Sequence, residues 1–410
     1  MPRPPRLPTP VRDRVRRVRR ALPAALVRRV DVLLGATPAP PTVDELARAL
    51  RTPSVPEQDT RLLVAPVNFA GQGHAWARAV EAHVPGVGAR SMAVEGPMGF
   101  PADQVVPSPA YRDVVWQRTQ ERHLLEHYTH VLVEASRPVL GTLYGRTCAE
   151  ELPVLRRGGL QVGLIAHGSD LRVPSRHAER FPHSPFTDPS DPLTRRLERN
   201  ARRAVELFAG FDGPTFVSTP DLLDDAPDAR WCPTVVDPAS WASGAPVLER
   251  RAPRVIHIPS RGRLKGSEHV DPVLQGLHAS GEIEYVRLEG VPHERVRREV
   301  READVLVDQA VMGLYGVSAL EGLAAGRVVL GFVGDRVRDR VRDTTGLEVP
   351  VVEITPETLA EVLADLLADR DRARTVAAAG PGFVREVHDG RWSARVLGRL
   401  TVTDPDRAEQ

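Results

Sequence analysis

Short apolar runs rich in Val, Leu and Ile alternate along most of the chain with longer amphipathic segments. Such runs are typical of parallel strands that are covered on both faces, and the segments between them have the pattern of helices. This repeated strand–helix order predicts an α/β protein with parallel sheets. We expect strands at 62–64, 129–136, 161–166, 216–219, 254–259, 283–288, 305–307, 328–330 and 351–354, and helices at 150–157, 318–325, 358–367 and 386–400.

The length of the chain requires more than one domain, because 410 residues exceed the size of a single ordinary core. We expect a Pro- and Arg-rich arm at 1–60 and a first α/β domain at 61–236. A second α/β domain is expected at 237–385, followed by an amphipathic terminal helix and polar tail at 386–410.

The arm begins with closely spaced prolines and continues at 11–34 as a basic amphipathic stretch, in which Pro23 interrupts the helical pattern. Arginines fill much of the face opposite its apolar stripe. Two interpretations stay open: the stretch contacts an anionic membrane surface, or its apolar stripe packs on the body of the protein. The stripe consists of Val11, Val15, Val18, Leu22, Leu26, Val30 and Leu33.

Composition excludes several classes of protein. The formal net charge of +1 provides no overall attraction to nucleic acid. Only two cysteines are present, without a CxxC motif, which argues against a disulfide framework or a structural zinc site and suits a reducing cytoplasm. No apolar run approaches the ~20 residues of a transmembrane helix, and arginines interrupt the best candidate for a signal peptide. We expect a cytoplasmic protein whose arm is its one candidate contact with the inner membrane face.

The most informative stretch joins the strand at 305–307 to the helix at 318–325 through a polar, glycine-containing loop. The free amides at the start of that helix favour an anion, and Glu321, one turn further in, can accept hydrogen bonds from a hydroxylated ligand. The stretch therefore predicts a ligand that carries both phosphate and sugar. Its candidate binding residues are Asp308, Gly313, Tyr315, Gly316, Val317 and Glu321.

A second candidate site follows the strand at 254–259. Lys265 is the only lysine in a chain that otherwise uses arginine, and Arg261 and Arg263 lie beside it. Fixed cations of this kind bind anionic groups, Arg through a bidentate contact and Lys as a point charge. The alternative interpretation is a solvated basic turn.

Polar residues also follow two strands of the first domain, where open α/β sheets bind ligands. His167 and Asp170 belong to the sequence His-Gly-Ser-Asp after the strand at 161–166. A glycine-containing loop follows the first strand, and we expect it to line a cleft. It resembles the acceptor-side loop that follows the first strand in GT-B enzymes. Its candidate residues are Asn68, Gly71, Gln72, Gly73 and His74.

Together these motifs resemble the retaining glycosyltransferases of family 4, over roughly Leu62 to Leu400. Glu321 matches the second Glu of the family's donor motif, Gly-Arg-Val-Val at 326–329 approximates its tail, and Lys265-Gly266 matches its Lys-Gly. The first Glu is absent, because Gly313 stands at its position. The resemblance implies a GT-B fold, in which two Rossmann-like domains face each other across a cleft and a terminal helix crosses back to the first domain.

The resemblance also implies roles. Lys265, with Arg261 or Arg263, would bind the diphosphate; Glu321 the ribose hydroxyls; the amides of 315–317 the sugar or phosphate; and His167 the transferred sugar. Asp308 is a candidate to replace the carboxylate missing at 313. The expected reaction transfers a sugar from a nucleotide-sugar to a hydroxylated acceptor with retention. The family's front-face route is expected, in which a phosphate oxygen helps to deprotonate the acceptor.

We expect no metal ion and no cofactor, because the D-x-D match at 369–371 lies in a helical charge run. The acceptor is expected among cell-envelope polysaccharides, glycolipids or natural-product glycosides. Two other functions stay open on the same fold: a nucleotide-sugar 2-epimerase and a non-enzymatic protein that binds a sugar nucleotide or a partner. A third open point is the loop at 167–172, where an ion pair between Asp170 and Arg172 is an alternative to ligand binding.

Overall fold

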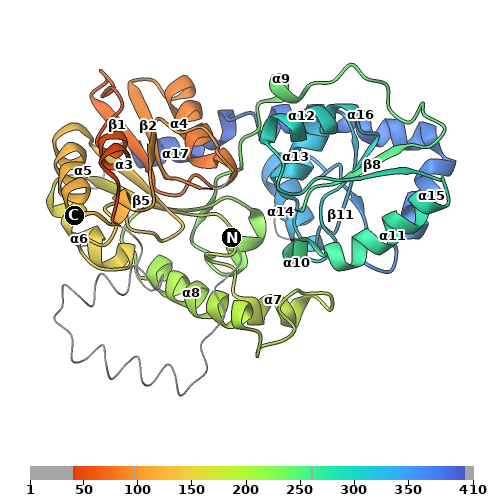
Figure 1. The fold of residues 1–410 in the computed structure, drawn as a ribbon, viewed down its shortest axis with the longest axis horizontal. Coiled ribbons are helices and arrows are strands. Elements are labelled where there is room, and N and C mark those ends of the chain that lie inside the picture. Colours follow the sequence, from red (N-terminus) through yellow and green to blue (C-terminus); the bar gives the residue numbers. More distant parts are fainter. Residues whose placement is uncertain (1–39, 97, 260–261, 402–410) are drawn as a thin grey trace.

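The structure, a computed structural model, describes residues 40–96, 98–259 and 262–401. The predicted basic helix of the arm, Arg261 and the polar tail lie outside these residues. The described chain contains two parallel sheets with helices packed around them, one in each half of the molecule (Figure 1). The predicted α/β class with parallel sheets is confirmed.

The N-terminal domain contains a seven-stranded parallel sheet in the order β3-β2-β1-β4-β5-β6-β7. Its central strands are buried over most of their length because both faces are covered, as their continuous apolar sequences predict. The strands are β1 (Thr60–Ala65), β2 (Val87–Val94), β3 (Gln104–Val106), β4 (His130–Glu134), β5 (Gln161–Ala166), β6 (Thr215–Val217) and β7 (Arg230–Trp231).

The helices of this domain begin with strong sequence signals. Asp113 accepts hydrogen bonds from the first amides of one helix and Asp191 from those of another, whose first residue is Pro192. The α-helices are α3 (Val43–Ala49), α4 (Gln72–His83), α5 (Val114–His127), α6 (Cys148–Arg157), α7 (Pro174–Arg180) and α8 (Pro192–Ala209), with 3₁₀ turns η1 (Phe69–Gly71), η2 (Ala110–Arg112) and η3 (Pro220–Asp224).

The C-terminal domain contains a five-stranded parallel sheet in the order β12-β11-β10-β8-β9. Its strands are β8 (Arg254–His257), β9 (Glu284–Arg287), β10 (Val305–Val307), β11 (Val328–Gly331) and β12 (Val352–Glu353). Its helices are α9 (Pro238–Trp241), α10 (Gly262–Lys265), α11 (Ser267–Ala279), α12 (His293–Glu302), α13 (Val317–Ala324), α14 (Asp335–Thr345), α15 (Leu359–Ala368) and α16 (Arg370–Val387). In the described part of the chain, no helix has both the length and the apolar character needed to span a membrane.

The last helix, α17 (Arg391–Thr401), returns to the N-terminal domain, where it packs against α4 and β5 (Figure 1). Leu400 contacts Gly163 of β5, and the Ser393 hydroxyl donates a hydrogen bond to the carbonyl of Pro233 at 2.7 Å. The chain therefore crosses between the two domains twice, once before α9 and once after α16.

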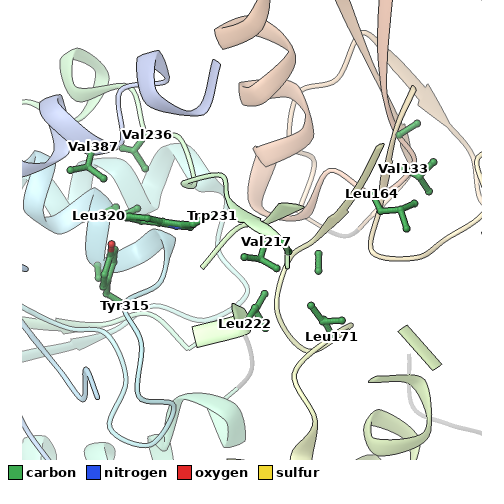
Figure 2. Packing of buried hydrophobic residues seen from close by; sticks show 14 of the residues in the cluster. Val133, Leu164, Leu171, Val217, Leu222, Trp231, Val236, Tyr315, Leu320 and Val387 are labelled. Carbon is green, nitrogen blue, oxygen red and sulfur yellow. The ribbon is translucent and has the colours of Figure 1, made fainter. Parts of the chain in front are cut away.

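One hydrophobic cluster continues from the N-terminal sheet into the C-terminal domain (Figure 2). It reaches from Val133 and Leu164 through Trp231 to Leu320 of α13 and Val387 of α16. Because these buried residues come from both domains, the crossover region is part of a shared core. This core fixes α13, the helix that carries Glu321.

A close helix contact behind the site generates the first prediction. A side chain at Gly380 of α16 would place its Cβ 2.7 Å from the carbonyl oxygen of Leu323 in α13, whereas a Cβ at Gly382 meets nothing within 4 Å. We expect Gly380→Ala to lower the free energy of unfolding by about 1–3 kcal/mol through overpacking. Gly382→Ala, the matched control, should raise it by about 0.5–1 kcal/mol.

Chemical denaturation of the three proteins checks this prediction. Equal effects of the two substitutions would show that α16 does not support α13 at this contact.

Candidate functional site

The β10–α13 loop, residues 308–316, lies beside Lys265 at the carboxyl ends of β8 and β10. The Lys265 Nζ donates hydrogen bonds to Asp308 Oδ1 at 2.8 Å and to Ser318 Oγ at 2.5 Å. Ser318 Oγ donates in turn to Asp308 Oδ1 at 2.6 Å, and the amide of Gly316 donates to Asp308 Oδ2 at 3.0 Å. The two stretches singled out in the sequence therefore meet at the N-terminus of α13.

Asp308 is ionised in this arrangement. Burial alone would raise its pKa, but the Lys265 ammonium and the hydrogen bonds from Ser318 and Gly316 hold the pKa below its ordinary value. The carboxylate lies beneath the loop and fixes Lys265 and the Gly316 amide. Asp308 is thus an anchor of the site, and it does not occupy the place of a side chain at position 313.

Glu321 has a partner that the sequence analysis did not identify. His293, the first residue of α12, lies with Nε2 3.1 Å from Glu321 Oε1. Burial raises the pKa of Glu321, and the His293 contact offsets only part of that effect. Phe100 of the N-terminal domain and Trp241 contact the His293 ring with centroid distances of 5.4 and 5.5 Å. Glu321 is therefore a buried carboxylate beside the boundary between the domains.

Gly313 cannot carry a side chain in this structure. Its φ is +66°, and an added Cβ would lie 2.5 Å from Cζ of Phe181. Phe181 follows α7 of the N-terminal domain, so a ring from the opposite domain fills the space next to this position. At the position where the resembled family carries its first Glu, this chain thus has a specific packing contact with Phe181. Phe181 and Gly313 are far apart in sequence, so this contact is visible only in the structure.

The N-terminal side of the site is built around Glu134, which the sequence analysis missed. Its side chain is fully buried at the end of β4 and accepts hydrogen bonds from the amides of Val67 and Asn68 at 3.0 and 3.1 Å. His167 Nε2 lies 3.0 Å from Glu134 Oε1. The His167 ring is nearly buried and packs against the rings of Phe69 and Trp76. Glu134 therefore orients His167.

Asp170 accepts hydrogen bonds from the amides of His167 and Gly168, so it shapes the loop after β5. The expected alternative ion pair of Asp170 with Arg172 is wrong, because Arg172 Nη2 binds Asp221 Oδ2 at 2.5 Å. Arg172 reaches the loop after β6, a partner that its sequence neighbourhood does not indicate.

The residues of the glycine loop after β1 separate into two groups. Asn68 and Gly73 lie at Glu134, and Gly73 has no room for a side chain because a Cβ would lie 2.8 Å from Glu134 Oε1. Gly71, with φ of +76°, lies against the ring of Phe100.

The second group has structural partners. Gln72 bonds to the backbone of Val235 in the crossover, and His74 Nδ1 lies 2.9 Å from Ser91 Oγ. Neither side chain is directed to the Glu134–His167 pair by these contacts.

Strained backbone accumulates in the loops after the adjacent strands β1 and β4. In the described chain, four of the five non-glycine residues with positive φ lie there: Asn68, Ala70, Ala135 and Ser136, with φ between 49° and 53°. Each such conformation costs of the order of 1 kcal/mol or more. Backbone strain of this kind is concentrated at functional sites in proteins, which marks these loops as part of the site.

Arg263 contacts the N-terminal domain. Its Nη1 lies 2.9 Å from Asp191 Oδ1, and its Nη2 donates to the carbonyl of Pro185 at 2.9 Å. The site residues of the C-terminal domain are therefore in direct contact with the segment around α7. Among the described residues, no group of three or more His, Cys, Asp and Glu side chains has the arrangement of a metal site.

No family model and no curated protein matches the chain. Solved structures match it. WaaG, a glycosyltransferase involved in lipopolysaccharide biosynthesis, has 14% identity and a TM-score of 0.53, over 84% of this chain and 100% of its own. The sucrose-phosphate synthase of Thermosynechococcus elongatus has 12% identity and a TM-score of 0.54, over 83% and 98%. Anabaena HepE, solved with UDP and glucose, has 10% identity and a TM-score of 0.53, over 83% and 98%.

These likenesses define the fold. The chain has the GT-B fold of glycosyltransferases, with two Rossmann-like domains, as the sequence predicts. At such low identities the likeness shows the fold alone, so membership of family 4 stays a prediction.

The raised pKa of Glu321 generates the second prediction. Its folded state binds a proton more tightly than its unfolded state, so this group stabilises the fold below its unfolded pKa, and the contribution is lost as pH rises through the folded pKa. Glu321→Gln removes the cost of a buried charge. We expect the variant to be more stable than the wild type at pH 7 by about 1 kcal/mol.

Chemical denaturation between about pH 4 and pH 8 measures this difference, a range that begins near the ordinary pKa of Glu. The advantage of the variant should shrink toward the acidic end, where the wild-type carboxyl is protonated. A variant that is less stable at pH 7, or a difference that does not change with pH, would contradict the assignment of a buried, proton-binding Glu321.

Proposed function

We propose that the protein is a glycosyltransferase that moves a sugar from a nucleotide-sugar to a hydroxylated acceptor. The observation that carries the proposal is the joint position of Lys265 and the start of α13, with Glu321 one turn further along the helix. A cation and free helix amides bind phosphate, and a carboxylate binds sugar hydroxyls. The fold shared with glycosyltransferases supports this assignment.

In the proposed complex, Lys265 binds the diphosphate. Two of its three N–H groups contact Asp308 and Ser318, which hold the ammonium at the N-terminus of α13. The charge on the diphosphate grows as the glycosidic bond breaks, so a cation already fixed by Asp308 stabilises the transition state without reorganisation. We propose that Lys265 supplies the positive charge that stabilises the leaving diphosphate, and we expect no metal requirement.

Glu321 is proposed to accept hydrogen bonds from the ribose hydroxyls in exchange for its contact with His293. On the other domain, His167 is proposed to contact the transferred sugar, with Glu134 holding its ring. The hydroxylated acceptor is proposed to approach over the strained loops after β1 and β4. The acceptor is proposed to belong to cell-envelope polysaccharide, glycolipid or natural-product glycoside synthesis.

We propose retention at the anomeric carbon by a front-face route. The nearby carboxylates are engaged by the protein: Asp308 by Lys265, Glu134 by two amides and His167, and Asp170 by the amides of its own loop. A phosphate oxygen of the donor is then the group that accepts the proton of the attacking hydroxyl.

One observation favours a second candidate function. Phe181 fills the space beside Gly313, where the family carries a carboxylate, and a protein that binds a sugar nucleotide without transferring it would tolerate this change. Product analysis separates the functions. Transfer requires an acceptor, 2-epimerisation proceeds without one, and a binding protein shows nucleotide affinity with neither product.

The third prediction concerns Lys265. We expect Lys265→Ala to weaken binding of the preferred nucleoside diphosphate by about 10- to 100-fold, because a charge-assisted contact is lost. Isothermal titration calorimetry with uridine, thymidine, guanosine and adenosine diphosphates measures the effect. Arg295→Ala, which removes a positive charge from an exposed side chain of α12, is the control and should bind as the wild type does.

Lys265→Ala leaves Asp308 buried without its cation, so a second variant separates binding from folding. Lys265→Met combined with Asp308→Asn removes both charges and should fold, yet bind as weakly as the single variant. Wild-type affinity in either variant refutes the assignment of Lys265 to the diphosphate.

A further inference from the structure

A segment of the N-terminal domain docks on the C-terminal domain next to the β10–α13 loop, residues 308–316, which is the candidate donor-binding loop and is called the donor loop below. This docking segment, residues 174–191, comprises α7 and the connection to α8, and in Figure 1 α7 lies close to α10. Phe186 of the segment belongs to the hydrophobic cluster of the C-terminal domain, together with Val311 and Met312. The segment therefore belongs to one domain by sequence and packs in the core of the other.

The first contact is a ring inserted between two glycines. Cζ of Phe181 lies 2.5 Å from the position of a Cβ at Gly313 and 3.2 Å from that at Gly334. The amide of Gly334 donates to the carbonyl of Gly313 at 3.1 Å, which joins the two glycines. Phe332 packs edge-on against the same ring with a centroid distance of 5.1 Å. The C-terminal domain thus has a socket for one aromatic side chain of the other domain.

The second contact is a buried hydrogen bond. His177 Nε2 lies 3.2 Å from the carbonyl oxygen of Met312, the residue before Gly313, and Nδ1 lies 2.7 Å from Ser184 Oγ. Burial lowers the pKa of His177 to about 4, so the ring is neutral at physiological pH. A neutral ring that donates from Nε2 to Met312 accepts from Ser184 at Nδ1, and both bonds are satisfied at once.

The donor loop is also held by its own domain, through Asp308 at the Gly316 amide and through Gln309. The side chain of Gln309 accepts hydrogen bonds from the amides of Val311 and Met312 and donates to the carbonyls of Leu314 and Phe332. At the turn itself, Gly313 has φ of +66° and its carbonyl accepts from the Gly334 amide. The opposite domain adds His177 at the carbonyl of Met312 and the Phe181 ring beside Gly313. The turn therefore depends on contacts from both domains, and those of the opposite domain fall at Met312 and Gly313.

We propose that Phe181 and His177 are positioning residues that act across the domain boundary and hold the 308–316 loop in the shape that binds the donor. The inference rests on the proposed function for the identity of that ligand. Its physical content is a coupling: separation of the domains withdraws the ring and the imidazole, so the loop loses its shape and the site loses affinity. Donor binding and domain closure then favour each other.

The experiment combines hydrogen exchange with calorimetry on the full chain. In Phe181→Ala and His177→Ala, amide exchange at 310–316 should rise and the affinity for the preferred nucleoside diphosphate should fall, each by about tenfold. Phe181→Leu and His177→Gln keep an apolar side chain and an N–H donor respectively, so they should restore most of both quantities. Phe211→Ala, on the N-terminal domain near Arg156, is the control and should change neither.

A double-variant cycle tests the ring contact itself. Gly313→Ala should weaken the affinity strongly in the wild type and much less in Phe181→Ala, because the added methyl group then has room. Gly346→Ala is the control for backbone strain, since Gly346 has φ of +74° with no atom within 4 Å of an added Cβ. The effect of Gly346→Ala on the affinity should be the same in the wild type and in Phe181→Ala.

The outcomes distinguish the two proposals. If none of the four nucleotides binds the wild type but exchange at 310–316 still rises in Phe181→Ala, the proposed function fails and the positioning role stands. Exchange at 310–316 within about twofold of the wild type in both alanine variants overturns the positioning role, whatever the nucleotide affinity. Strictly additive effects of Phe181→Ala and Gly313→Ala overturn it as well.

Discussion

The buried ion pair of Lys265 with Asp308 is the interaction on which the rest of the site depends. A lysine at the end of a short helix would otherwise lie in solvent, and an aspartate buried at the carboxyl end of the central strand β10 would otherwise be protonated. Together with Ser318 and the Gly316 amide, the pair joins the β8 side of the domain to the start of α13. It fixes one positive charge at the mouth of a helix whose amides already favour an anion, and Glu321 on the same helix then lies at a fixed distance from that charge.

The second determinant is the contact between the domains. A helix from the N-terminal domain supplies a ring to the glycine turn of the candidate donor loop, and a terminal helix of the chain returns to the N-terminal sheet. These contacts and the shared hydrophobic cluster leave the two halves dependent on each other (Figures 1 and 2). The glycine at 313, which departs from the family pattern, is explained by the neighbour it accommodates. The Phe181 ring fits beside position 313 only because glycine has no side chain there.

Local patterns predicted much of the fold and singled out two stretches that the structure brings together in the candidate site. Val-rich runs identified the buried strands because both faces of a covered parallel strand are buried, so nearly all of its residues are apolar. The Lys-Gly turn and the 308–321 stretch were found because they occupy the ends of such strands. The partners Glu134, His293 and Phe181 were missed, since each is far from its target in sequence and ordinary in its own segment. Glu134 carried one usable signal, a carboxylate at the end of an apolar run. The pairing of Arg172 with Asp170 was wrong because the true partner, Asp221, follows another strand.

The central claim is that Lys265 and the start of α13 bind a nucleotide's phosphates with Glu321 on its ribose. A crystal structure of the protein soaked with the nucleoside diphosphate that binds best in solution tests it most directly. The account predicts phosphate oxygens within hydrogen-bond distance of Lys265 Nζ and of the first amides of α13, and ribose hydroxyls on Glu321 in place of His293. A nucleotide bound elsewhere on the molecule, or one whose phosphates lie away from Lys265, would contradict it.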